Sequence, residues 1–417
     1  MKFYIESYGC TANKSDERLI KGLIYSHPQH KLTSSIEKAD TLIILTCTVI
    51  ATTEQRMLHR IRRLVQTGKR LVIAGCMASA QQKLLKEHFP NARLLPPRKI
   101  HLLFEVLNNT KTDEKPTKKA LAIKKYDDLI APVLIAEGCL FSCSYCITHV
   151  ARGTLLSYEK QAVVSSVKHA LQQGCKEIQL TAQDTASYGL DIQSSLPDLL
   201  RLICDISDDF MIRIGMMNPR TAKNIISDLL TYYTKPRVYS FLHLPIQSGD
   251  NDILNQMNRG YQVQDAVNII KQCRTKHPYI TIATDTIIGF PTETEEQFQK
   301  TIQVLKDIKP DVVNITRFSS RPFTKAKTMK GRIPTEIIKD RSRQMTSIVN
   351  QITKLRNKEY VGKTMTVLPL KKGKENTIIA RSSNYKPVVI QENITLGKKR
   401  TVDIVDATEA YLIGTLK

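Results

Sequence analysis

Three cysteines that stand close together constrain this chain more than any other feature. Cys139, Cys143 and Cys146 form a C-x3-C-x2-C array within the segment from Glu137 to Arg152. Three thiolates can hold a 4Fe-4S cluster whose fourth iron has no protein ligand, whereas ferredoxin clusters use four cysteines. The array therefore predicts an iron-sulfur cluster with one iron open to a substrate or a cofactor.

Zinc is the main alternative for this array, with His149 as a fourth ligand. Structural zinc sites usually combine C-x2-C pairs with each other or with histidines, and disulfides are rare in reducing compartments. The C-x3-C spacing and the aromatic Tyr145 directly before the last cysteine favour the iron-sulfur interpretation.

The charge of the chain indicates a polyanionic partner. Its 417 residues include 62 Lys and Arg against 39 Asp and Glu, a formal net charge of +23. A membrane surface is also anionic, but no basic amphipathic helix with large apolar anchors stands out, so nucleic acid is favoured. With no Trp and 6% aromatic residues, we expect contacts to RNA shape and phosphates more than an extended stacking platform.

The length of the chain leaves room for two or three domains. Its first residues contain no apolar signal segment, and the longest apolar run, 41–51, is too short to cross a bilayer. We therefore expect a cytoplasmic protein with reduced thiols and no membrane partner.

Residues 1–108 alternate between strand-like and helix-like segments, which predicts a doubly wound α/β domain. The expected strands are 3–7, 41–45 and 70–74, and the expected helices are 16–25, 53–65, 80–88 and 100–107. The helix 53–65 is basic, and its arginines are candidate phosphate ligands: Arg56, Arg60, Arg62 and Arg63.

Each of the three expected strands is followed by a cysteine: Cys10, Cys47 and Cys76. Ligands of open α/β sheets gather at the carboxyl ends of the strands, so these thiols can meet at one edge. Gly9 and Gly75 precede two of them and would allow a bulky group to approach the backbone. A buried cysteine is more often a small apolar side chain, but the threefold repetition favours a second three-cysteine cluster site. Three other cysteines are expected only to pack in the core: Cys175, Cys204 and Cys273.

A Lys- and Asp-rich stretch, 109–128, predicts a solvated linker before a second α/β domain, 129–357. Six strand-like segments followed by helices predict a partial (β/α)6 barrel: 133–136, 177–181, 211–215, 240–244, 281–287 and 312–318. The carboxyl ends of barrel strands carry active sites, and they are rich here in polar residues: Gln183, Asp184, Asn218, His243, Gln247, Asp285 and Arg317. Each of these has the alternative of a loop cap or a satisfied core partner, and for His243 site and structure are equally favoured.

Residues 358–417 change to short alternating segments, which predict a small β-barrel. Basic clusters at 371–374 and 398–400 favour RNA binding by this barrel over a purely structural cap.

Taken in order, the motifs of the chain resemble those of the radical methylthiotransferases, whose C-terminal barrel is the TRAM domain. The matching segments are YGCTANKSDE, ADTLIILTCTV, LVIAGCMA, GCLFSCSYCITHVARG, QLTAQDTASYG, FLHLPIQSG, MNRGY and DTIIGFPTETEE. The chain departs from the usual family motifs at Thr46, Leu140 and Thr292, and none of these departures removes a cluster ligand.

The resemblance implies two 4Fe-4S clusters and S-adenosylmethionine (SAM) as cofactors. The open iron at Cys139, Cys143 and Cys146 would bind SAM and cleave it to a 5'-deoxyadenosyl radical, while Cys10, Cys47 and Cys76 would hold an auxiliary cluster that carries sulfur. Five further residues are expected to bind the cofactor: Tyr145, Gln183, Asp184, His243 and Gln247.

The resemblance further implies a methylthio transfer to C2 of N6-threonylcarbamoyladenosine, next to the anticodon in the anticodon stem-loop of tRNA. Members acting on N6-isopentenyladenosine in tRNA, or on an Asp side chain of a ribosomal protein, are the alternatives within the family. A non-catalytic iron-sulfur RNA-binding module is the alternative outside it.

Overall fold

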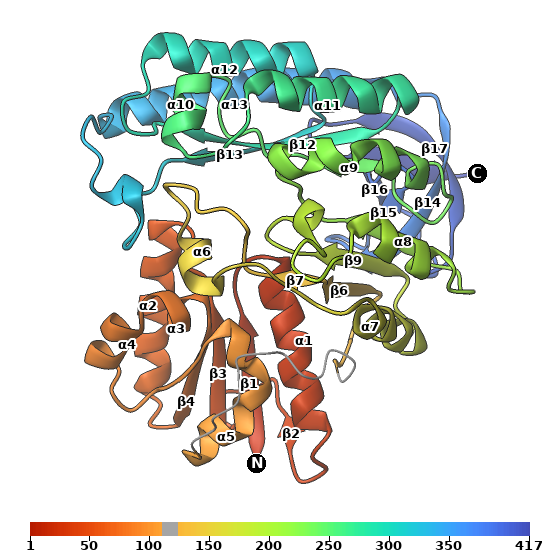
Figure 1. Ribbon diagram of the computed structural model, residues 1–417. Helices are drawn as coiled ribbons and strands as arrows, with labels where there is room; N and C mark the ends of the chain where they lie inside the picture. The colour runs from red at the N-terminus through yellow and green to blue at the C-terminus, as the bar shows by residue number, and fades with distance from the viewer. Residues whose placement is uncertain (111–123) are drawn as a thin grey trace.

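The computed structural model describes residues 1–110 and 124–417 (Figure 1). The N-terminal part is a five-stranded parallel sheet with the order β2-β1-β3-β4-β5. Its strands are β1 (Lys2–Ser7), β2 (Lys31–Leu32), β3 (Thr41–Thr46), β4 (Arg70–Gly75) and β5 (Arg93–Leu95). The predicted doubly wound α/β fold is therefore confirmed. The short strands β2 and β5 were not predicted, because two or three residues leave no readable periodicity.

Helices cover both faces of this sheet. They are α1 (Thr11–Tyr25), α2 (Ala51–Val65), α3 (Cys76–Ala80), α4 (Gln82–His88), η1 (Pro97–Leu102) and α5 (Leu103–Asn108). Alternate residues of β3 face opposite ways: Ile43 packs with α1, η1 and α5, and Leu42 packs with α2, α3 and α4. Two predicted helices were wrong in detail, because Gln81 leaves helical geometry between α3 and α4, and the segment expected as helix 100–107 begins within a 3-10 turn.

The central part is a partial barrel of six parallel strands, as predicted. They are β6 (Ile130–Leu134), β9 (Glu177–Thr181), β10 (Met211–Ile214), β11 (Phe241–His243), β12 (Thr281–Ile288) and β13 (Val312–Arg317). Two three-stranded sheets, β6-β9-β10 and β11-β12-β13, are joined by a bridge between Ile212 and Val238. Among the described strands no pairing connects β6 to β13, so the barrel is open there.

Helices wrap the outside of this barrel and bury the largest apolar cluster of the described chain. They are α7 (Lys160–Gln172), α8 (Leu196–Cys204), α9 (Pro219–Tyr232), α11 (Val263–Lys276), α12 (Glu295–Ile308) and α13 (Thr335–Lys358). Shorter elements lie in the loops: β7 (Ala136–Glu137), α6 (Ile147–Arg152), β8 (Leu156–Ser157), η3 (Thr185–Ser187), α10 (Asn251–Gln256) and η4 (Lys325–Lys327). Cys175 and Cys273 are buried in this cluster and Cys204 packs against it.

The C-terminal part is a closed five-stranded barrel with the order β14-β15-β16-β18-β17, as expected for a small β-barrel. Its strands are β14 (Thr364–Lys372), β15 (Ile378–Ser382), β16 (Pro387–Ile390), β17 (Arg400–Ala407) and β18 (Leu412–Leu416). The last strand was not predicted. It closes the barrel by pairing with β16 and β17. Its five residues alone do not indicate these pairing partners.

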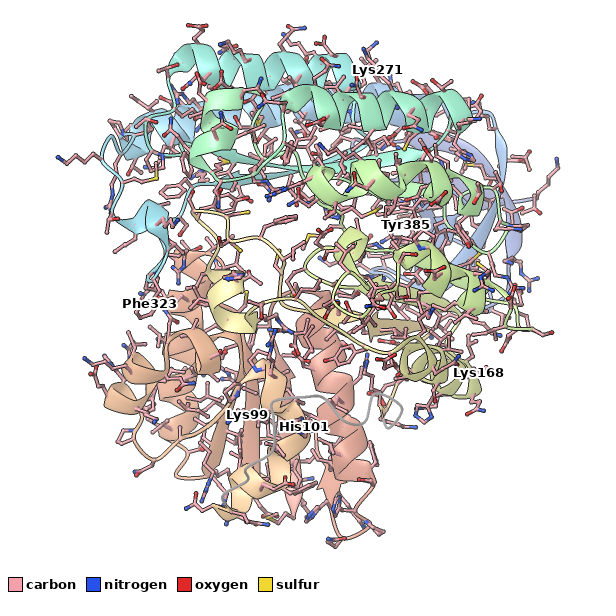
Figure 2. The ribbon with its side chains drawn as sticks, in the orientation of Figure 1. Lys99, His101, Lys168, Lys271, Phe323 and Tyr385 are labelled. Carbon is pink, nitrogen blue, oxygen red and sulfur yellow. The ribbon has the colours of Figure 1, made fainter. Side chains whose placement is uncertain are left out.

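Tyr385 of the C-terminal barrel closes the floor of the central barrel (Figure 2). Its ring centroid lies 4.8 Å from those of Tyr239 and Phe241. Its hydroxyl donates a hydrogen bond to Glu177 (3.3 Å) and accepts one from Gln179 (3.3 Å). Tyr385 thus joins the two barrels through ring packing and through the hydrogen bonds of its hydroxyl.

The predicted linker, 109–128, lies mostly outside the described residues. Its described end is packed: Tyr126 is buried, and buried Lys124 donates to the hydroxyl of Ser15 on α1 (2.9 Å). None of the helices in residues 1–110 and 124–417 is long and apolar enough to span a membrane.

Candidate active site between two three-cysteine loops

The first set of cysteines gathers at the carboxyl end of the N-terminal sheet. Cys47 and Cys76 follow β3 and β4 directly, and Cys10 follows β1 after two residues. Gly9 adopts φ +105°, and a Cβ on it would lie 2.9 Å from the Cβ of Cys47. Gly75 adopts φ +85°, and a Cβ there would lie 2.7 Å from the carbonyl oxygen of Thr46. Only glycine allows the loops to come this close.

The thiols of this set influence one another electrostatically. Burial raises the pKa of Cys47, and neighbouring Cys10 adds to the increase. Burial raises the pKa of Cys76 to about 12, with Cys10 and Cys47 raising it further and Arg152 opposing them. Without a bound cation these groups stay protonated thiols, and the iron of a cluster would favour their thiolate form.

The second set of cysteines lies on the loop that follows β7, in front of the barrel mouth. Gly138 adopts φ +74°, and a Cβ on it would overlap the carbonyl oxygen of Thr154. Burial raises the pKa of Cys139 to about 12, with Asp184 and the thiols of Cys146 and Cys143 adding to it.

Each set offers three free thiols, the donor type that both zinc sites and iron-sulfur clusters use. Zinc requires four donors at about 2.0–2.3 Å, and in the described part of the chain no three His, Cys, Asp or Glu side chains are gathered tightly enough to hold one metal ion. The geometry gives the zinc alternative with His149 no support.

Arg259 is a residue of this site that the sequence did not single out, although its motif, MNRGY, was recognised. Its buried guanidinium donates to the sulfur of Cys143 (3.3 Å) and to the carbonyl oxygen of Pro245 (3.2 Å). Burial lowers the pKa of Arg259, but Tyr145, Tyr261 and Cys143 outweigh it, so its pKa lies above the ordinary value and the side chain stays charged. A fixed positive charge therefore contacts one of the three thiols.

A cavity of about 290 Å³ lies next to Cys146 of the second set and reaches the loop that follows Cys47 of the first. Its lining combines the loop after Cys47 with the array and the barrel mouth: Val49, Ile50, Tyr145, Cys146, Ile147, Thr148, Gln247, Asp285, Ile287, Asn314, Thr316, Arg317, Phe318 and Ser319. Two predicted cofactor-binding residues, Tyr145 and Gln247, thus line it. Gln247 adopts φ +74°, a strained conformation of the kind that clusters at active sites.

His243 acts beside the cavity through Asp285. Its Nε2 lies 3.0 Å from Oδ1 of Asp285, and Asn314 donates to the same oxygen (2.6 Å). Burial raises the pKa of Asp285, but the hydrogen bond and charge of His243, with the hydrogen bond from Asn314, outweigh burial and leave the pKa below its usual value. Asp285 therefore presents a carboxylate to the cavity, with His243 orienting it.

Gln183 and Asp184 differ in what they can still bind. Oε1 of Gln183 is buried without a hydrogen-bond partner among the described residues, so it is free to accept from a ligand. The carboxylate of Asp184 is occupied: it accepts from the backbone N–H of Ala186 (3.1 Å) and Asn218 (3.0 Å) and from the hydroxyl of Thr221 (2.7 Å). Asp184 thus fixes η3 and the start of α9, and its role as a cofactor ligand stays a prediction.

Arg152 connects the two cysteine sets, and the sequence did not reveal it. It ends α6, and its fully buried guanidinium donates to Asp16 (2.9 Å) and Asn13 (2.9 Å) of α1 and to Glu137 of β7 (2.7 Å). Asn13 in turn accepts a long contact from the thiol of Cys76 (3.9 Å). One side chain therefore holds the loop of the second set against the edge that carries the first.

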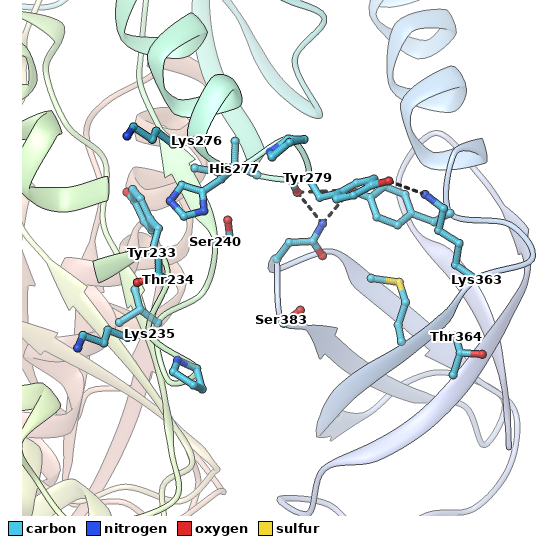
Figure 3. A pocket seen from close by; sticks show the side chains of 17 residues that line it. Tyr233, Thr234, Lys235, Ser240, Lys276, His277, Tyr279, Lys363, Thr364 and Ser383 are labelled. Carbon is cyan, nitrogen blue, oxygen red and sulfur yellow. Dashed lines mark hydrogen bonds between the residues drawn. The ribbon is translucent and has the colours of Figure 1, made fainter. Parts of the chain in front are cut away.

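A larger cleft of about 570 Å³ lies away from both sets, between the central and C-terminal barrels (Figure 3). Three lysines line it, Lys235, Lys276 and Lys363, beside the ring of Tyr279. Lys363 lies 4.4 Å above that ring and donates to its hydroxyl (3.4 Å). Because these residues precede β11 and β12 or belong to the C-terminal barrel, the cleft is at the opposite end of the strands from the cysteines.

Comparison with known proteins places the whole chain. Residues 2–95 match Uncharacterized protein family UPF0004, residues 133–305 the Radical SAM superfamily, and residues 358–417 the TRAM domain. The chain is similar to the probable threonylcarbamoyladenosine tRNA methylthiotransferases of Archaeoglobus fulgidus (39% identity, 100% of this chain and 99% of that protein) and Methanocaldococcus jannaschii (40%, 100% and 97%). It is also similar to the threonylcarbamoyladenosine tRNA methylthiotransferase of Homo sapiens (30%, 99% and 73%). The chain belongs to the threonylcarbamoyladenosine tRNA methylthiotransferase family.

Solved structures agree with the fold at low identity. The radical S-adenosylmethionine methyltransferase TsrM of Kitasatospora setae aligns with a TM-score of 0.57 at 14% identity, over 78% of this chain and 74% of that one. The cobalamin-dependent radical enzyme OxsB aligns with a TM-score of 0.53 at 8% identity, over 84% and 55%. The methylthiotransferase fold is thus that of a radical SAM enzyme, whose cofactors are SAM and an iron-sulfur cluster.

The departures from the usual methylthiotransferase motifs are accommodated locally. The hydroxyl of Thr46 donates to the carbonyl oxygen of Ala74 (2.7 Å), within the sheet. Thr292 adopts φ +72°, which is strained for a β-branched residue, and its hydroxyl donates to the side chain of Gln256 (2.7 Å). Leu140 is half exposed.

Proposed function

We propose that this methylthiotransferase adds a methylthio group to C2 of N6-threonylcarbamoyladenosine, next to the anticodon of tRNA. One observation carries the proposal: a single cavity is lined both by Val49 and Ile50, on the loop after Cys47, and by Cys146. Groups held by the two cysteine sets would then act on one substrate in this cavity. The names of the archaeal and animal relatives support threonylcarbamoyladenosine over isopentenyladenosine or a ribosomal protein. The extent of the match supports an enzyme rather than a passive RNA-binding module.

Each cysteine set has its own role in this proposal, which therefore includes two 4Fe-4S clusters. Cys139, Cys143 and Cys146 would hold the cluster that binds SAM, and Cys10, Cys47 and Cys76 the auxiliary one. When bound, the cofactors supply a radical and sulfur, because the C2–H bond of adenine has no acidic proton and no leaving group for polar catalysis. The protein supplies the cavity and the positions of the groups around it.

The side chains around the cavity bind and orient the cofactor. Tyr145 and Gln247 line the space next to Cys146, and Asp285 offers a carboxylate that His243 holds in place. Gln183 offers an unoccupied buried acceptor, and Asp184 keeps the neighbouring loop fixed. The proposal divides the chain into an N-terminal domain (1–108), a linker (109–128), a radical SAM domain (129–357) and a C-terminal barrel (358–417).

We further propose that the anticodon stem-loop lies along the basic surface. Arg56, Arg62 and Arg63 of α2 are exposed, whereas Arg60 is engaged by Glu6 (2.8 Å). The exposed Lys371, Lys372 and Lys374 extend the charge to the C-terminal barrel. The lysines of the cleft in Figure 3, at the opposite end of the barrel strands, would contact another part of the tRNA. Such contacts bind phosphates without reading sequence.

Nucleoside mass spectrometry tests the proposed reaction. Anaerobically reconstituted protein would be incubated with reductant, sulfide, SAM and tRNA that contains threonylcarbamoyladenosine. We expect a new 2-methylthio nucleoside. Formation of 5'-deoxyadenosine without a modified nucleoside would refute the substrate and move the activity to isopentenyladenosine tRNA or a ribosomal protein. A cytoplasmic location remains a prediction from the sequence.

A further inference from the structure

Phe323 is the most exposed large apolar side chain of the described residues. It lies on the loop between β13 and η4, is 72% exposed and adopts φ +63°. A bulky side chain in this left-handed region is a genuine outlier. Packing does not compensate the strain, because most of the ring is in solvent. An outlier of this kind, held in place next to an active site, is the observation from which a function is inferred.

The loop around Phe323 is pinned to both cysteine sets. On one side, buried Arg321 donates to the hydroxyl of Thr48 (3.0 Å), the residue after Cys47, and to Glu54 of α2. On the other side, the backbone N–H of Ala326 donates to the carbonyl oxygen of Ser144, between two cysteines of the second set (2.8 Å). Phe323 is therefore presented from a fixed loop beside the helices of the N-terminal part (Figure 2).

The surroundings of Phe323 are positively charged. Arg317, Lys325, Lys327 and Lys330 are exposed on the same segment, and Arg317 lines the cavity. Within residues 1–110 and 124–417 none of these four forms an ion pair. An exposed ring among free cations is the pattern by which proteins hold unpaired nucleotides, with the base on the ring and the phosphates on the cations.

We propose that Phe323 is a stacking site for an unpaired base of the RNA substrate, beside the base that enters the cavity. The site adds one aromatic contact to a surface that otherwise binds phosphates. It rests on the proposed function only in taking RNA as the substrate. A protein partner or a second copy of the chain would need an apolar surface around the ring, where the segment instead presents cations.

Binding measurements on the reconstituted full chain test this site. The probe is a fluorescently labelled anticodon hairpin containing threonylcarbamoyladenosine, compared with an RNA duplex of equal length. Stacking on one aromatic side chain predicts that Phe323→Ala weakens hairpin binding about 5- to 160-fold and changes duplex binding less than about twofold. Phe323→Trp should retain hairpin affinity. Leu355→Ala, which truncates an equally exposed side chain on α13 (67% exposed), should leave it unchanged.

Phe323→Gly separates stacking from a structural role. Glycine accepts φ +63° without strain, so this variant should lose the same affinity while its thermal unfolding midpoint equals or exceeds that of the wild type. The proposal would be overturned if Phe323→Ala bound the hairpin as tightly as the wild type does. It would also be overturned if the thermal unfolding midpoint of Phe323→Gly were below that of the wild type, or if the wild type formed a dimer that Phe323→Ala does not form. If the wild type binds the hairpin through Phe323 but does not thiolate it, the proposed reaction fails and the stacking site stands.

Discussion

Replacing Arg152 by methionine should destabilise the protein by about 3–5 kcal/mol, the usual effect of removing one partner of a buried ion pair. The side chains of Arg152 and Asp16 have no exposed area, and that of Glu137 is 1% exposed. Burial lowers the pKa of Arg152, but Asp16, Cys76 and Glu137 outweigh it and keep the pKa above its ordinary value, so the guanidinium is charged. The substitution removes the guanidinium that both of these buried carboxylates contact.

Urea denaturation of the metal-free protein, followed by circular dichroism, measures this loss. Arg343→Met is the matched control, because Arg343 and its partner Asp340 are 74% and 71% exposed and an exposed pair contributes about 0–1 kcal/mol. Arg152→Lys should lie between the wild type and Arg152→Met, since a lysine keeps the charge and loses the fork that reaches two partners. A loss below about 1 kcal/mol for Arg152→Met would refute the idea that this residue joins the two cysteine sets.

Three further results are expected. In metal-free folded protein, Cys76 and Cys139, each with a pKa of about 12, should react with iodoacetamide about 100-fold faster at pH 10 than at pH 8. The reason is that the thiolate fraction rises tenfold per pH unit below the pKa. A reaction rate that does not change with pH would contradict the burial of these thiols, and urea-unfolded protein is the control. Tyr385→Ala should cost about 3–5 kcal/mol in unfolding experiments, and Tyr385→Phe about 1 kcal/mol, so equal losses would argue against the ring packing. Lys363→Ala should reduce the slope of log affinity for tRNA against log salt by about 1, and an unchanged slope would exclude its phosphate contact.

The barrel strands were predictable because their signal is local. The segment expected at 177–181 is β9 itself, and the one expected at 281–287 is one residue shorter than β12. Runs of buried β-branched residues that end in polar ones determine such strands. The placement of Cys10, Cys47 and Cys76 after strands also implied their shared edge, because parallel strands end together.

The contacts that organise the site could not be predicted in this way. Arg152 and Asp16 are 136 residues apart, and Arg321 and Glu54 are 267 residues apart. In sequence each arginine resembles an ordinary surface residue, since arginine is rarely buried without a partner. Asp184 was predictable as a site residue from its position at a strand end, but its partners were not: Oδ1 accepts from the backbone N–H of Ala186 and Asn218, and Oδ2 from the hydroxyl of Thr221.

The most direct test of two cysteine sets acting on one cavity compares the products of Cys10→Ala and Cys143→Ala. Both variants would be incubated with SAM, reductant, sulfide and threonylcarbamoyladenosine tRNA, and 5'-deoxyadenosine and the 2-methylthio nucleoside would be quantified. We predict that Cys10→Ala still forms 5'-deoxyadenosine but no 2-methylthio nucleoside, whereas Cys143→Ala forms neither. Normal thiolation by Cys10→Ala would contradict the role of the N-terminal set in carrying sulfur.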